Sequence, residues 1–115
     1  MMLSSHSEAF DRIIAGATAK FKETLMTRVL DLEAAMIEID KGADLKPRLM
    51  LISALAHKTA GVAATLNFSE IGILALKLET AIDASAKYED TSTIWNHIRP
   101  KLDRMLDAME SALEA

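Results

Sequence analysis

The side chains of this chain that could perform chemistry reduce to its three histidines. The 115 residues contain no cysteine, which excludes thiol nucleophiles, disulfides and cysteine-held metal centres. A di-iron site in a helical bundle needs Glu three residues before a histidine, but Leu3, Ala54 and Ile94 stand there. The glycine-rich nucleotide loops, the HExxH zinc motif and the GxSxG hydrolase elbow are also missing. What is left is an imidazole acting without a metal.

His57 differs from His6 and His97 in its position on a predicted helix. Setting Ile52 at zero and allowing about 100° per residue, the apolar stripe of residues 45–66 continues through Leu55, Thr59, Val62 and Leu66, all within about 80°. His57 falls at about 140°, which places it on the outward face. His6 lies near a terminus and His97 on a mixed helical segment, so we expect both to be ordinary surface residues.

The outward face around His57 is made of small or apolar residues where Glu and Lys would be usual: Met50, Ser53, Ala54, Ala60, Gly61 and Ala64. A glycine inside a helix costs about 1 kcal/mol relative to alanine, so Gly61 requires a reason. Small residues would let another protein approach the imidazole closely. Alternatively, the same face packs against a further helix or a second copy.

The elements that must position His57 follow from the apolar spacing of three and four residues. This spacing predicts a short leading helix at 7–17 and longer helices at 18–40, 45–66, 69–84 and 91–113. Gly42 is expected to end one helix, Ser69 to cap the next, and Thr91 or Ser92 to cap the last. Pro100 predicts a kink or break in that last helix, and residues 15–17 either separate or bend the first two.

Short connections make neighbouring helices antiparallel, and helices with one apolar stripe bury it by closing into a bundle. The sequence therefore predicts one all-α domain over residues 1–115: an antiparallel up-and-down four-helix bundle with a short additional N-terminal helix.

Residues 56–68, AHKTAGVAATLNF, resemble the signature of histidine-containing phosphotransfer (HPt) domains. In that family an Ala-His pair is followed by Gly four residues after the histidine, here Gly61, and the match continues through Ile71, Leu74, Ala75, Leu78 and Glu79. The family usually has Lys three residues after the histidine, where Ala60 stands, and Gly where Asn67 stands. Asn tolerates the left-handed backbone that a helix end can require, so the second departure is harmless.

The resemblance implies that His57 is the phosphoacceptor, exchanging a phosphoryl group with the aspartate of response-regulator receiver domains. Lys58 or Lys77 would supply the cation that Ala60 lacks, and Met50, Ser53, Ala54, Ala60, Gly61 and Ala64 would form the receiver-docking patch. The implied partners are receiver domains and a hybrid histidine kinase. No cofactor is expected on this chain, because the receiver supplies Mg²⁺, and no ATP-binding module is present to make it an enzyme with its own turnover.

Charge and hydropathy limit the other partners. Seventeen acidic against thirteen basic residues give a net charge of -4, which does not favour nucleic acid. No apolar run approaches the roughly 18 residues of a membrane span, and residues 1–6 do not resemble a signal peptide, so we expect a cytosolic monomer. Two alternatives stay open: a degenerate HPt domain that binds a receiver or kinase without phosphotransfer, and a bundle that dimerises through its Ala-rich face.

Overall fold

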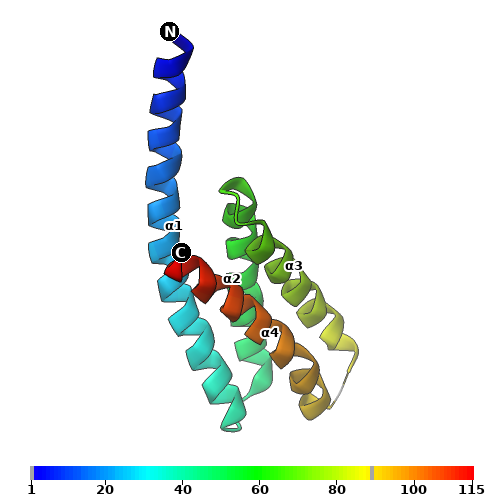
Figure 1. The fold of residues 1–115 in the computed structure, drawn as a ribbon. Helices are drawn as coiled ribbons and strands as arrows, with labels where there is room; N and C mark the ends of the chain where they lie inside the picture. Colours follow the sequence, from blue (N-terminus) through cyan, green and yellow to red (C-terminus); the bar gives the residue numbers. More distant parts are fainter. Residues whose placement is uncertain (1, 89) are drawn as a thin grey trace.

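The computed structural model describes the backbone of residues 2–88 and 90–115 and the side chains of 7–88 and 90–115. Within these residues the chain forms four α-helices: α1 (Met2–Asp40), α2 (Leu45–Thr65), α3 (Ser69–Ala84) and α4 (Thr91–Glu114), with a short 3₁₀ turn, η1 (Ser85–Lys87), after α3. Successive helices run in opposite directions, and α4 returns to pack beside α1 (Figure 1). The prediction of an all-α, up-and-down four-helix bundle is confirmed.

The predicted short N-terminal helix is not a separate element. Residues 7–17 and 18–40 belong to one continuous helix, α1, which passes through Gly16 without a break. Alanines on both sides of this glycine keep the local helix propensity high. The first third of α1 consequently extends beyond the ends of the other three helices (Figure 1).

The helices end and begin close to the residues predicted to cap them. Gly42, with φ of 94°, closes the end of α1, and Asn67, with φ of 67°, turns the chain between α2 and α3. The last helix is capped one residue earlier than predicted: the Asp90 carboxylate accepts hydrogen bonds from Ser92 N and Thr93 Oγ1. Ser69 is the first residue of α3, and Phe68 precedes it without a side-chain cap. The helix α4 continues through Pro100, so the break considered there does not occur.

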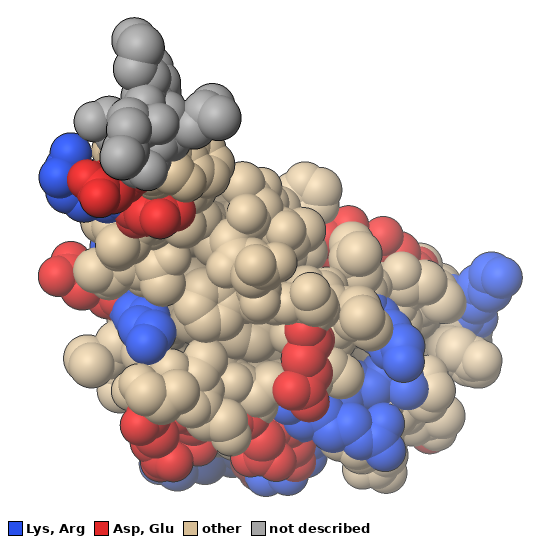
Figure 2. All heavy atoms as spheres, turned by 45° about the horizontal axis from the view of Figure 1, so that its top comes forward, with Lys and Arg blue, Asp and Glu red and all other residues tan. Residues whose placement is uncertain are grey.

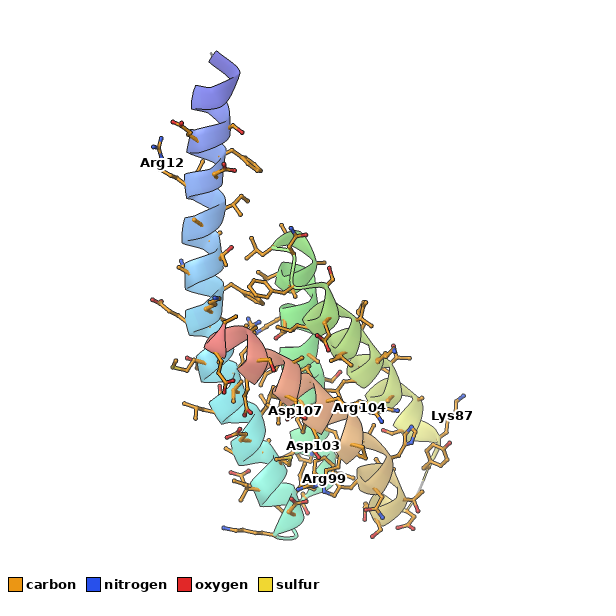
Figure 3. The ribbon with its side chains drawn as sticks, in the orientation of Figure 1. Arg12, Lys87, Arg99, Asp103, Arg104 and Asp107 are labelled. Atoms are coloured by element: carbon orange, nitrogen blue, oxygen red, sulfur yellow. The ribbon has the colours of Figure 1, made fainter. Side chains whose placement is uncertain are left out.

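The core is apolar, and polar contacts at its edges connect α1 to α4 and α1 to α2. Trp95 Nε1 donates to Asp40 at 2.8 Å and Arg99 also binds Asp40, which joins the end of α1 to α4. Arg99 binds Asp103 on its own helix as well (Figure 3). The hydrogen bonds from Arg99 and then Trp95 lower the pKa of Asp40. Between α1 and α2, Arg28 donates to the buried Thr59 hydroxyl at 2.9 Å.

None of the described helices combines the length and the hydropathy that crossing a lipid bilayer would require.

Candidate functional site

The helix α2 buries part of the stripe predicted for it, namely Leu45, Leu49, Ile52 and Thr59, but replaces the rest with three alanines, and this sets the position of His57. Its buried residues are Leu45, Leu49, Ile52, Ala56, Thr59, Ala60 and Ala63, whereas Val62 is 40% exposed and Leu55 and Leu66 are half-buried. At about 100° per residue the centre of burial is rotated by about 70° toward α3. Alanine faces allow two helices to approach closely, and the prediction gave too much weight to large side chains.

This rotation places His57 at the boundary between α2 and α3 rather than on the far side of α2. The His57 side chain is 74% exposed, and its Nδ1 lies 2.9 Å from Oε2 and 3.2 Å from Oε1 of Glu79 on α3. The Glu79 side chain is only 24% exposed, so the carboxylate is held against the bundle while the ring extends from it. A carboxylate can only accept, so Nδ1 carries the hydrogen in this contact and Nε2 is left free.

His57 stands at one end of a groove of about 840 Å³ between α2, α3 and the start of α4. Its apolar wall includes Leu49, Ile82 and Ile94, and Met50 and Tyr88 lie along its rim. Its charged lining residues are Lys46, Lys58, Glu79 and Asp83. The imidazole is therefore accessible from a surface that offers apolar contacts together with a few charges of both signs.

Most of the predicted docking patch lies on the exposed side of α2. Met50 is 66% exposed, Ala54, Gly61 and Ala64 are exposed, and Ser53 is half-buried. A methyl group built on Gly61 would meet no atom within 4 Å, so no intramolecular packing explains this glycine.

The prediction for Ala60 is wrong, because this residue is buried at 7% exposure in the contact between α2 and α3. Its carbonyl oxygen lies 3.9 Å from the position that a Cβ on Gly72 would take. The rotation of the buried stripe moved Ala60 into the core. The position where the family usually has Lys is thus a helix-packing position in this chain.

Two lysines were candidates for the missing cation, and the structure separates them. Lys58 is exposed, follows His57 directly and lines the same groove. Lys77 precedes Glu79 by two residues, so on an α-helix it points about 200° away from the carboxylate that faces His57. Of the two lysines, only Lys58 is among the residues that line the groove containing His57, about 100° from it around α2.

Sequence reasoning missed two residues of α3. Glu79 was named only as a position that matches the family, although it lies level with His57 in the hairpin formed by α2 and α3. Leu76, one turn earlier, is 54% exposed. The signal available in the sequence was a leucine that falls outside the apolar stripe of Ile71, Leu74, Ala75 and Leu78.

Among the residues whose side chains are described, no three His, Asp or Glu side chains gather as metal ligands would.

The family model for the Hpt domain matches residues 17–112, which include all of α2, α3 and η1 and most of α1 and α4. No curated protein and no solved structure gives a significant match to the chain.

Proposed function

Because this chain belongs to the Hpt domain family, which acts in phosphorelays, we propose that it carries a phosphoryl group on His57 between the aspartates of response-regulator receiver domains. The observation that supports this best is the arrangement of the imidazole, which is 74% exposed and anchored through Nδ1 to Glu79. It leaves Nε2 as the nucleophile on a rigid helix.

The contact with Glu79 suits each stage of the transfer. Nε2 attacks the phosphorus of the receiver's aspartyl phosphate, the N–P bond forms, and the P–O bond breaks to release the aspartate as a carboxylate. The ring, now substituted on Nε2 and still protonated on Nδ1, carries a positive charge beside the Glu79 carboxylate. No proton has to leave, and the return of the phosphoryl group follows the same path backwards. Glu79 is thus a positioning residue that also stabilises the charged ring.

Lys58 is the cation of this site in our proposal. Its ammonium group is on a long flexible stem next to His57, and it can swing toward phosphoryl oxygens on the ring. Phosphoryl transfer depends mainly on in-line positioning and on stabilising charge on these oxygens. A flexible lysine beside the ring would replace the one expected at position 60.

The surface on which the receiver docks comprises Met50, Ser53, Ala54, Gly61 and Ala64 of α2 together with Leu76 of α3, and we name it the docking face. Small residues beside His57 allow the receiver's aspartate to approach the ring within the distance that in-line transfer requires. Met50 and Leu76 are both largely exposed and would provide apolar contact to the receiver.

The partners that fit this role are receiver domains and a hybrid histidine kinase that supplies the phosphoryl group. The receiver would hold the Mg²⁺, so this chain needs no cofactor of its own. It would act in the cytoplasm as a relay intermediate rather than as an enzyme.

Phosphotransfer from a purified, phosphorylated receiver tests this proposal. We expect a base-stable, acid-labile phosphate on the wild-type chain and none on His57→Gln. His97→Gln is the matched control, because His97 is also an exposed helical histidine. Labelling of His57→Gln would contradict the assignment of the phosphoacceptor.

The second candidate function is a degenerate HPt domain that binds a receiver or kinase without accepting phosphate. The burial of Ala60 favours it, because the usual lysine is replaced by a helix-packing residue. If the wild-type chain binds receivers from its source organism but none of them transfers phosphate to it, this result would support the adaptor role.

A further inference from the structure

The groove that contains His57 continues beyond the docking face, toward the start of α4. Its total volume of about 840 Å³ is in the range of roughly 300–1,000 Å³ that is usual for binding pockets. We name the part nearer α4 the distal groove. It is lined by Leu49, Ile82, Ser85, Ala86, Tyr88 and Ile94.

The floor of the distal groove is apolar. Leu49 and Ile82 are buried, at 6% and 8% exposure, and Ile94 is half-buried. Ser85 is buried as well, but its hydroxyl donates a hydrogen bond to the carbonyl oxygen of Ile82 and is therefore already satisfied. Water that covers such a floor is released favourably when an apolar group of a partner replaces it. The distal groove therefore fits an apolar side chain.

The distal groove differs from the other apolar surfaces of the molecule in its position. Figure 2 shows an uncharged surface beside the extended end of α1, with charged residues at its margins. That surface lies beside α1, whereas the distal groove and His57 belong to one and the same groove. A protein that reaches His57 therefore comes to the distal groove as well.

The distance from His57 decides how much of the groove such a protein covers. A standard interface covers about 800 Å² of each partner, which corresponds to a patch of roughly 16 Å radius. At 1.5 Å per residue along α2, Met50 lies about 10 Å from His57 and Lys46 about 16 Å. Both residues also lie within about 20° of His57 around the helix. A receiver domain centred on His57 thus covers the distal groove.

We propose that the receiver inserts an apolar side chain into the distal groove and that this contact determines which receivers bind. The inference rests on the proposed function, because the partner is the receiver whose aspartate meets His57. The inserted side chain lies on the same face of the receiver as that aspartate and roughly 10–16 Å from it. A receiver with a charged side chain at this place would have to bury the charge against Leu49, Ile82 and Ile94, and it is rejected for that reason.

Methyl NMR of the wild-type chain, titrated with the unphosphorylated receiver, tests this contact separately from phosphotransfer. We expect the methyl resonances of Ile82 and Ile94 to shift when the receiver binds. Ile37 is the matched control, because it is an isoleucine of α1 that is 49% exposed and is not among the residues of the groove. Its resonance should not shift.

Filling the distal groove should weaken binding of the receiver. Ala86→Trp places a large side chain in it from the short turn η1. Ala84→Trp is the matched control, because Ala84 is also exposed but is not among the residues that line the groove. Isothermal titration calorimetry should give a dissociation constant about tenfold higher for Ala86→Trp and an unchanged one for Ala84→Trp. Circular dichroism verifies that both variants fold, and the NMR result decides if Ala86→Trp does not.

Two results would overturn the inference. One is a receiver that binds without shifting the resonances of Ile82 and Ile94, and the other is binding that Ala86→Trp and Ala84→Trp affect equally. The proposed phosphotransfer survives either result if His57 still acquires phosphate. Conversely, insertion into the distal groove without labelling of His57 would support the inference together with the adaptor role. A chain that binds no receiver would contradict both proposals.

Discussion

Removing the Glu79 carboxylate should slow phosphotransfer without unfolding the protein. In Glu79→Ala the Nδ1 of His57 loses the acceptor that stands 2.9 Å away. A hydrogen bond to a charged group is worth about 1.5–3 kcal/mol, while exposed ion pairs give about 0.2–1 kcal/mol. With Glu79 24% exposed and His57 74% exposed, we expect an intermediate loss of about 1–2 kcal/mol in the transition state, which is a reduction in rate of about 5- to 30-fold.

The assay is rapid-quench measurement of the first-order transfer step from a saturating phosphorylated receiver. Glu79→Gln keeps an acceptor oxygen but loses the charge, so its rate should lie between those of the wild type and Glu79→Ala. Asp83→Ala is the matched control, because Asp83 lines the same groove one turn further along α3. Nitrogen NMR of the ring should show the hydrogen on Nδ1 in the wild type and a loss of this preference in Glu79→Ala. Wild-type transfer by Glu79→Ala with an unchanged tautomer would refute the positioning role.

Three further predictions concern the cation, the docking face and the bundle. Lys58→Ala should lower the transfer rate and Lys77→Ala should leave it unchanged, because of the two only Lys58 lines the groove that contains His57. Equal effects in the same rapid-quench assay would contradict this. Gly61→Ala should stabilise the fold by up to about 1 kcal/mol, measured by urea unfolding. Gly61→Glu should keep the helicity but block transfer. Normal transfer by Gly61→Glu would remove the role given to this glycine. A side-chain hydrogen bond with Glu33 raises the pKa of Glu110, so the native state loses stability as the pH rises from the ordinary glutamate pKa through the raised one. Glu110→Gln should therefore gain about 0.3 kcal/mol of stability at pH 7, as for an exposed like-charge pair. A gain that persists at pH 3 would contradict this cause.

The fold could be predicted largely from the sequence because its helices have clear apolar spacing and chemically distinct ends. Gly42 and Asn67 adopt the left-handed backbone that their positions suggested. The continuity of α1 through Gly16 was not predictable from local signals, because a single glycine between alanines fits either a bend or an uninterrupted helix.

The site was predicted less completely, for a physical reason. Periodicity ranks faces by hydrophobicity, but α2 packs on α3 through Ala56, Ala60 and Ala63, whose small size matters more than their hydropathy. The resulting rotation moved Ala60 into the core and turned His57 toward Glu79. A contact between two helices depends on their rotation about their own axes, and a single helical wheel does not contain that information.

The most direct measurement is phosphorus NMR of the chain after incubation with a phosphorylated receiver. We expect one phosphohistidine resonance in the wild type, bonded through Nε2, that is absent from His57→Gln and returns to the receiver when unphosphorylated receiver is added. A chain that binds the receiver but never acquires this resonance would contradict the phosphotransfer role of His57.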